Sequence, residues 1–380
     1  MKKSFSVIAT AGFLLAAVLP LAAQGFLGIL EFSALTASTN ASDIAMGESY
    51  AANPYGISSF THNPANLMGV TGVNVFYNYR DNEAIDFLDR SRYLGIGATM
   101  STAIGNFGFS YQEFLLGRFT AISLEDPDIV TSQVEFSDHV FNLSFSRDYS
   151  DQFSYGVSVK LYDADITTLS GPEIAFSSKS AFVFDVGAIY WLPGFIATRE
   201  VTDHLFFGAS LQNFGTDFES KIAAQEAYAA EQLPRFFRLG FAYRLHAQSP
   251  GTAFSFKYLL TGEYRRYLNA PDGYDQSNRD FGGLGFKAMF FDMFAIQLGG
   301  HYTPYSNFTG QEDKFNFRYG FDLHLALRQF GGDYPIDFLF QYAQVPVNDA
   351  LWPDIDGKPN GLSVFSIQVS YTESIFQALK

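Results

Sequence analysis

Apolar and polar residues alternate along most of this chain, most clearly at residues 314–328. Large apolar side chains occupy every second position there, and the intervening positions hold polar or small residues that include Arg318, Asp322 and His324. Because successive side chains of a strand point to opposite faces, this strand has one apolar face and one charged face. Half-buried strands of soluble sandwiches usually alternate for about five or six residues. An alternation of this length predicts a membrane-crossing strand, with the apolar face toward lipid and the charged face toward a barrel lumen.

Similar alternation recurs to the C-terminus and predicts an all-β fold, a transmembrane antiparallel β-barrel of about 14 strands. The predicted strands lie near residues 70–80, 92–103, 105–116, 137–147, 152–163, 180–191, 203–214, 234–246, 253–267, 279–290, 292–303, 314–328, 335–345 and 361–371. Connections after odd-numbered strands are long, and those after even-numbered strands are short. Outer-membrane barrels have this pattern of extended outer loops and tight periplasmic turns, so both termini are expected in the periplasm.

Composition supports a membrane barrel over a helical membrane protein. Aromatic residues make up 17% of the 380 residues, charged residues only 17%, and mean hydropathy is +0.02. Beyond the first residues no apolar run is long enough for a spanning helix, whereas alternation averages to near-neutral hydropathy. The net charge of −15 argues against a nucleic-acid partner. With no cysteine, the chain has no disulfide, no lipid-attachment thiol and no thiol chemistry.

The chain divides into four predicted segments. Residues 1–23 are typical of a secretory signal peptide, with Lys2 and Lys3 before a short apolar core, and a retained anchor is the alternative. Residues 24–69 lack alternation and predict a compact, mostly non-strand segment, in which residues 40–43 favour the start of a short helix. The barrel spans 70–371, and a tail of residues 372–380 follows it.

Two motifs in the non-strand segment resemble a known family. The run Ser42-Asp43-Ile44-Ala45-Met46-Gly47-Glu48-Ser49-Tyr50-Ala51 and the later Asn63-Pro64-Ala65-Asn66-Leu67 are similar to the FadL-type outer-membrane superfamily, and most similar to its PorV/PorQ branch. Met46, Gly47, Asn63, Pro64, Ala65 and Leu67 match the family pattern. Glu48 and Ser49 replace the usual small pair.

The resemblance implies a fourteen-stranded barrel whose residues 24–69 fold into the lumen as a hatch. It implies a non-enzymatic protein of the outer membrane of a Gram-negative-type bacterium, with outer-membrane lipid around it and no cofactor. PorV/PorQ-like proteins take part in type IX secretion, which implies protein export with cargo or secretion-machinery proteins as partners. FadL-like proteins form channels for hydrophobic small molecules, and that function is the alternative.

The polar face of the strands predicts a set of lumen-facing charges. They are Lys160, Asp185, Arg238, Arg244, Lys257, Glu263, Arg265, Lys287, Arg318, Asp322, His324 and Asp337. These charges are expected to satisfy one another or to contact the hatch, because a charge facing lipid at mid-membrane costs roughly 2–4 kcal/mol. Their mixed signs disfavour a continuous apolar tunnel.

Other candidate sites are weaker. Arg318, Asp322, His324 and Asp337 could form a hydrolase-like cluster, but no serine lies in a nucleophile elbow, so no catalytic residue is predicted. The histidines at positions 62, 139, 204, 246, 301 and 324 lack ligand spacing, so no metal site is predicted. Acidic loops at 125–128 and 349–356 could bind calcium, although solvated loops are the simpler interpretation. Residues 220–231, rich in Ala and Glu, predict a helix in an outer loop.

Overall fold

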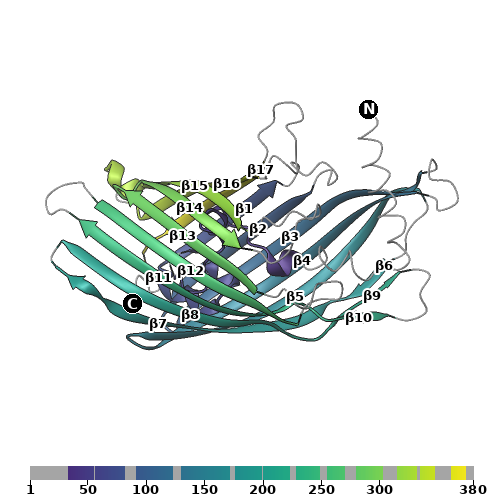
Figure 1. The fold of residues 1–380 in the computed structure, drawn as a ribbon, viewed down its shortest axis with the longest axis horizontal. Helices are drawn as coiled ribbons and strands as arrows, with labels where there is room; N and C mark the ends of the chain where they lie inside the picture. The colour runs from purple at the N-terminus through teal and green to yellow at the C-terminus, as the bar shows by residue number, and fades with distance from the viewer. Residues whose placement is uncertain are drawn as a thin grey trace.

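A computed structural model describes residues 33–373, except 55, 82–90, 123–129, 172–175, 199, 223–227, 249–254, 270–279, 303–314, 332–333 and 347–360. The predicted signal peptide, the start of the predicted hatch and most of the predicted tail lie outside the described residues. Antiparallel strands close into a fourteen-stranded barrel, which confirms the predicted fold class (Figure 1). None of the helices within the described ranges is long and apolar enough to cross a membrane.

The barrel strands follow one another around the wall in chain order, and the last pairs with the first. They are β1 (Val73–Asp81), β2 (Arg92–Thr102), β3 (Gly105–Ile122), β4 (Val130–Ser150), β5 (Phe153–Ser170), β7 (Ala181–Ala197), β8 (Val201–Gly215), β11 (Arg235–Gln248), β12 (Ser255–Asn269), β13 (Asp280–Phe290), β14 (Phe294–Tyr302), β15 (Phe315–Ala326), β16 (Ile336–Pro346) and β17 (Gly361–Tyr371). Closure leaves no unpaired sheet edge in the wall, as a membrane-spanning sheet requires.

The pleat separates an apolar outer face from a polar inner one. On β15, Phe315 and Phe317 are 60% and 52% exposed, whereas Asp322 on the alternate face is fully buried. The same division holds on β17, where Phe365 and Ile367 are exposed and Ser366 is buried. A register slip of one residue would turn the buried polar groups toward lipid, so the pattern specifies this register.

The two ends of the barrel differ in their connections. The connections that follow β2, β4, β7, β11, β13 and β15 are short, and we call this the short-turn end. Those that follow β1, β3, β5, β8, β12, β14 and β16 lie at the opposite, long-loop end. One short turn contains the 3-10 helix η3 (Leu327–Phe330).

Three strands extend much farther than predicted at the long-loop end. The ladder between β3, β4 and β5 continues through residues 117–122, 130–136 and 164–170, which the alternation pattern assigned to loops. These predicted boundaries are wrong because strand pairing continues past the point where the outward-facing side chains stop being apolar. A separate sheet of β6 (Phe176–Lys179), β9 (Phe218–Ile222) and β10 (Ala229–Glu231) lies beside these long strands (Figure 1).

The helix predicted at residues 220–231 is also wrong. Its first residues belong to β9 and its last to β10, and residues 223–227 lie outside the described part of the chain. Pairing of β9 with β6 and β10 overrides the helix propensity of the Ala- and Glu-rich sequence, because propensity is a weak bias that tertiary contacts outweigh.

Residues 33–70 lie inside the barrel, where the shortest elements are seen in purple in Figure 1. We call them the hatch segment. It contains α3 (Ser33–Thr36), α4 (Ala41–Ala45), η1 (Ser59–Thr61) and η2 (Pro64–Gly69). Asn40 caps α4 as predicted, since its side chain accepts a hydrogen bond from the Asp43 backbone N–H at 3.1 Å.

Candidate functional site

One part of the hatch segment contacts the wall through neutral groups. The Asn63 side chain donates to the carbonyls of Ala51, at 2.6 Å, and Ala188 of β7, at 3.2 Å. Its amide oxygen accepts from the Ala65 N–H and so caps η2. The Asn63-Pro64-Ala65 motif therefore both folds the segment and attaches it to the wall, and Leu67 is buried in an apolar cluster just beyond it.

Glycines on the inner face of the wall allow this close approach. A Cβ on Gly156 of β5 or Gly187 of β7 would overlap Pro64 and Asn63. Across the barrel, a Cβ on Gly283 or Gly299 would overlap the backbone of the Met46–Gly47 turn. The wall thus lacks side chains where the hatch segment lies against it. Inward-facing glycines on the strands are the sequence signal for these contacts, and the contacts were not predicted from it.

A second part of the hatch segment contacts the wall through charges. Arg318 of β15 donates to the Glu48 carboxylate at 2.6 Å, and Arg265 of β12 lies 3.7 Å from its other oxygen. Next along the chain, the N–H groups of Tyr50 and Ala51 both donate to Glu263 of β12 at 2.8 Å. Glu263 also accepts from the buried Arg238 at 2.6 Å, as expected for a buried charge that must be paired.

The turn that carries Glu48 has an unusual backbone. Gly47 and Glu48 have φ angles of 69° and 58°, in the left-handed region. A side chain at position 47 would overlap the backbone of β13 and β14. Glu48 adopts this region despite its Cβ, which costs on the order of 1–2 kcal/mol. Burial by itself raises the pKa of Glu48, but Arg318, His301 and Arg265 together hold that pKa well below its usual range.

Two titratable groups inside the hatch segment face each other. The carboxyl of Asp43 lies 3.7 Å from the His62 ring and accepts a hydrogen bond from Ser38. Burial raises the pKa of Asp43 to about 8, against the opposing effect of the Ser38 hydrogen bond. Burial, together with the charge of Arg238, lowers the pKa of His62 well below its usual range. Both shifts favour the neutral form, so the contact between Asp43 and His62 is polar rather than ionic.

The remaining lumen-facing charges are mostly paired within the wall. Lys160 lies 2.7 Å from Asp185 and donates to Asn213, whose left-handed backbone forms a bulge in β8. Lys287 pairs with Asp322, which also accepts from Gln341. In these contacts the buried charges are paired with each other, as their low exposure requires.

The hydrolase-like cluster does not form. Arg318 contacts Glu48, Asp322 contacts Lys287, and His324 contacts Asp337 at 3.3 Å, so the four predicted residues serve three separate interactions. The Nδ1–H of His324 also donates to the Asp292 carbonyl at 2.8 Å, which assigns the tautomer. Among the described residues, no three His, Asp or Glu side chains are placed to hold a metal ion.

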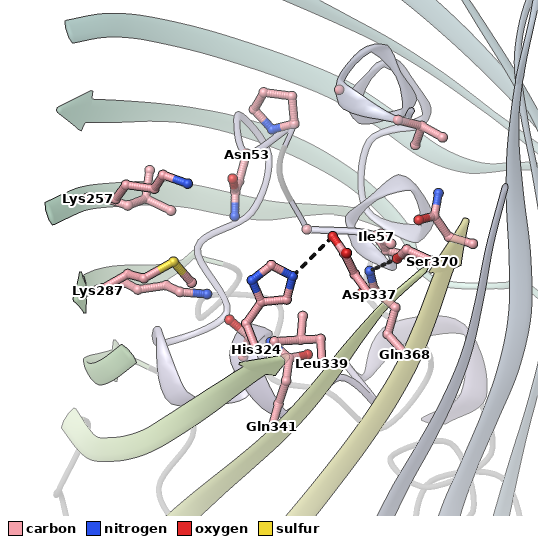
Figure 2. Close-up of a pocket in the computed structure, with 18 of the residues that line it drawn as sticks. Asn53, Ile57, Lys257, Lys287, His324, Asp337, Leu339, Gln341, Gln368 and Ser370 are labelled. Carbon is pink, nitrogen blue, oxygen red and sulfur yellow. Dashed lines mark hydrogen bonds and ion pairs between the residues drawn. The ribbon is translucent and has the colours of Figure 1, made fainter. Parts of the chain in front are cut away.

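A cavity of about 330 Å³ separates the hatch segment from the wall at the short-turn end (Figure 2). Lys257 and Lys287 project into it from one side, and the His324–Asp337 pair lies beside them. Lys257 pairs with Asp292 at 2.6 Å. The rest of the lining is Asn40, Ser42, Asn53, Pro54, Gly56, Ile57, Gly69, Val70, Thr71, Asn74, Arg244, Tyr258, Leu259, Met289, Leu339, Gln341, Gln368, Ser370 and Thr372. Polar residues are more numerous in this lining, but apolar atoms also form a large part of the cavity surface, so its character is mixed.

The long-loop half of the lumen holds two buried apolar clusters, together with the buried charges of Asp138 and Arg265. Inward-facing side chains of β2, β3, β4, β5 and β7 form a buried cluster with α3 and β9, which we call the apolar lumen cluster. Its members are Ala34, Tyr93, Phe114, Leu116, Phe136, Val140, Tyr162, Ala164, Ala181, Val183, Phe218 and Leu233. Across the barrel, Phe236, Tyr267 and Phe281 form a second cluster, the aromatic trio. The interior thus differs between its two ends. An apolar pocket was expected only from loop and hatch residues such as Phe60, whereas most of this apolar surface comes from the strands.

The predicted hatch residues all lie at contacts between the hatch segment and the wall. Met46 and Leu67 are buried, Gly47 forms the left-handed turn, and Asn63 to Ala65 form the neutral contact. Glu48, regarded from sequence only as a departure from the family pattern, is the central acid of the charged contact. An isolated acid in the predicted hatch, facing lumen arginines, was the signal that could have identified it.

Comparisons with known proteins find similarity at the level of architecture only. No family model and no curated protein matches the chain. A FadL homologue of Pseudomonas aeruginosa aligns over 89% of this chain and 99% of its own, at 11% identity and a TM-score of 0.46. The toluene transporter TodX of Pseudomonas putida aligns over 88% and 98%, at 10% identity and a TM-score of 0.43. These values are too low to indicate function, and the fold rests on the strand pairing described above.

Proposed function

We propose that the protein is an outer-membrane channel through which hydrophobic small molecules pass, controlled by the hatch segment. The observation that carries the proposal is the buried apolar surface in the long-loop half of the lumen, with the apolar lumen cluster on one side and the aromatic trio on the other. Apolar lining favours apolar solutes, because it gives a polar solute no partner for its hydrogen bonds. The proposal assigns no catalytic step to the protein.

The outer surface supports placement in a membrane. Large apolar side chains are exposed along the outward face of strands all around the barrel, from Val75 on β1 to Tyr371 on β17. Exposure on this scale is far beyond the apolar patches of soluble proteins and matches the band that faces lipid in outer-membrane barrels. The long loops then lie outside the cell and the short turns in the periplasm, as in barrels of this type.

The order of environments along the lumen suggests a route. A solute from outside meets the apolar clusters first, then the hatch segment, and then the cavity at the short-turn end. The hatch segment fills the middle of this route and contacts the wall on both sides. Passage therefore requires part of the hatch segment to move.

A second candidate function is protein export of the PorV/PorQ type, with a cargo or secretion-machinery protein as partner. The observation that favours it is the extension of β3, β4 and β5 at the long-loop end, together with the sheet of β6, β9 and β10. This sheet would project outside the cell and offer a rigid surface to another protein. Only Phe218 of this sheet belongs to the apolar lumen cluster.

Uptake of a radiolabelled alkylbenzene by cells that carry the wild-type or a variant gene tests the first proposal. Val140 and Val183 belong to the apolar lumen cluster, so the double variant Val140→Thr with Val183→Thr adds hydroxyls there at nearly constant volume. We expect uptake to fall several-fold. Thr99→Val is the matched control, since it makes the reverse exchange in the polar half, where Thr99 accepts from Asn74.

The same strains distinguish the two functions. Deletion of the gene should reduce alkylbenzene uptake and leave the set of secreted proteins unchanged. Unchanged uptake with a loss of secreted proteins would reject the channel in favour of export. Unchanged uptake in the double variant, despite reduced uptake on deletion, would show that the apolar lumen cluster is not the route.

A further inference from the structure

Two arginines from separate strands converge on one point of the hatch segment. Arg265 is on β12 and Arg318 is on β15, with β13 and β14 between them in the wall. The Arg265 guanidinium lies 3.7 Å from one oxygen of the Glu48 carboxylate, and the Arg318 guanidinium lies 2.6 Å from the other. Both arginine side chains are nearly buried, at 9% and 11% exposed. The wall therefore contributes two cations and the hatch segment a single anion.

Arg265 is incompletely satisfied in this arrangement. Its Nε atom is buried and has no hydrogen-bond partner among the described residues. Its distance of 3.7 Å to Glu48 exceeds the 2.7–2.9 Å typical of a charge-assisted hydrogen bond. Its guanidinium lies over the Phe281 ring, 4.5 Å from the centroid, and 5.6 Å from that of Phe236. A buried cation among aromatic rings thus keeps donor capacity that Glu48 does not use.

Glu48 reaches the arginines from a strained turn. Its φ of 58° and the tight fit of Gly47 against β13 and β14 are maintained only while the turn is docked. A planar carboxylate that was free of this backbone could approach both guanidinium groups in the two-bonded geometry that arginine prefers. The same residues therefore suit an external carboxylate at least as well as Glu48.

The site also faces the direction from which a solute would arrive. Arg265 lies toward the long-loop end of β12, and Arg318 lies toward the same end of β15. Phe236 and Phe281 of the aromatic trio contact Arg265 on this side. Glu48 and Arg318 keep a small exposed fraction, 14% and 11% of their side chains. An anion with an apolar body thus meets aromatic surface and both cations together.

We propose that Arg265 and Arg318 form a carboxylate-binding site of the barrel, which Glu48 occupies as a tethered internal ligand. A small organic carboxylate that enters from the long-loop half exchanges with Glu48, takes both guanidinium groups and releases the 46–50 turn from the wall. The exchange replaces one carboxylate with another, so the arginines remain paired throughout. Its consequence for passage rests on the function proposed above, whereas the binding site itself does not.

Benzoate binding to the purified full-length barrel in detergent, followed by calorimetry, tests the site. Glu48→Gln removes the competing carboxylate, so we expect benzoate to bind at least tenfold more tightly than to the wild type. Arg318→Met should abolish binding in either background. Glu219→Gln is the matched control, because Glu219 also pairs with a cation, Lys179, but in the sheet outside the barrel. This control should bind benzoate like the wild type.

Equal affinity of the wild type and Glu48→Gln for benzoate, or no binding by Glu48→Gln, would overturn the proposal. Glu48→Asp, which keeps the charge on a shorter side chain, gives a second comparison if Glu48→Gln does not fold, and its affinity should be intermediate. Benzyl alcohol tests the chemical class, because it keeps the ring and lacks the charge. Equal binding of benzyl alcohol and benzoate would reject a carboxylate site.

Hydrogen exchange reports the release of the turn. The N–H groups of Tyr50 and Ala51 bond to Glu263 while the segment is docked. Saturating benzoate should accelerate their exchange at least tenfold, and unchanged exchange would reject the release step. In one outcome, cells that carry the wild-type gene take up no more alkylbenzene than cells without it, while benzoate still binds the purified barrel and accelerates hydrogen exchange. That result would reject the proposed channel and leave the carboxylate site intact.

Discussion

Two of the contacts between the hatch segment and the barrel use different chemistry. Around Asn63 the contact is neutral, made of amide hydrogen bonds and of backbone packed against Gly156 and Gly187. Around Glu48 and Glu263 it is ionic and includes a strained turn. Neutral close packing depends on shape and has no competitor in solution, whereas an ion pair can be exchanged for another ion. We therefore expect the Asn63 side to act as the anchor and the Glu48 side to be the part that a competing anion releases.

The largest effect is expected from filling the space at the anchor. In Gly187→Val the new side chain overlaps the Asn63 amide and Pro64, so the neutral contact cannot form. We expect the conductance of the barrel in planar bilayers to rise several-fold, toward that of a protein lacking residues 33–70. Gly282→Val is the control, because the nearest atoms to its Cβ lie at 3.8 Å. Unaltered conductance in Gly187→Val would mean that this contact does not hold the hatch segment.

Loss of the buried ion pair at the center of the charged contact, Glu263 with Arg238, should have the next largest effect. Glu263→Gln leaves Arg238 buried without its ion pair and weakens the acceptor for Tyr50 and Ala51. Breaking a buried pair on one side typically costs about 3–5 kcal/mol. We expect a loss of this size in the free energy of urea unfolding in lipid vesicles. Glu219→Gln serves as the exposed control, and an equal loss in both variants would contradict a special role for Glu263.

Removal of the Asn63 side chain sharpens the description of the anchor. Asn63→Ala loses two donated hydrogen bonds and the cap of η2. We therefore expect the free energy of local opening of residues 60–68, measured by hydrogen exchange, to fall by about 2–3 kcal/mol. Asn63→Asp keeps the cap acceptor and loses the donors, so it should lie between Ala and the wild type. Hydrogen exchange of this stretch gives the comparison, and equal protection in all three proteins would exclude Asn63 as an anchor.

The smallest effect is a pH dependence from Asp43. Its docked pKa of about 8 lies above the ordinary value of 3.8, so its contribution to docking is complete below about pH 4 and is lost as the pH rises through 8. His62, with a lowered pKa, disfavours docking only below its ordinary 6.5, so the window from 6.5 to 8 isolates Asp43. The other charges near it are Glu48, Glu263 and, across α4, the Lys287–Asp322 pair.

The equilibrium between the docked and released segment should therefore shift by up to about tenfold between pH 6.5 and 8, since one pKa unit corresponds to a factor of ten. Because the docked form still predominates, we expect conductance to rise by less than in Gly187→Val. Asp43→Asn should show no such rise, because its side chain stays neutral. A rise that persists in Asp43→Asn would assign the titration to another group.

The strands of the barrel wall could be predicted from the sequence far better than the contacts inside the barrel. Strand number and register followed from the alternation, because lipid on one face and polar groups on the other penalise every slip. The lengths of β3, β4 and β5 did not follow, since hydrogen-bonded pairing continues where the apolar pattern ends. The helix expected at 220–231 failed for a related reason, because neighbouring strands decided the structure of β9 and β10.

Inside the barrel, the sequence identified the participants but not their pairing. Arg318 and Asp322 were expected to face the lumen, yet their partners Glu48 and Lys287 lie 270 and 35 residues away in the chain. Such distant contacts leave no periodic trace in a single sequence. Asn63 and Gly47 stood out through their motif, whereas the glycines opposite them are meaningful only once the register places them against the hatch segment.

The glycines on β13, β14 and β15 have a consequence for the open state. Gly283, Gly285, Gly299 and Gly320 all face the hatch segment, which fills the space that side chains would otherwise take. When the 46–50 turn moves away, the space beside Gly283, Gly285 and Gly299 is left unfilled and is bordered by the inward-facing side chains of His301, Arg318 and Gln297. If the proposed channel is correct, the room for a solute is thus provided by missing side chains of the wall, and the departure of one short loop opens it.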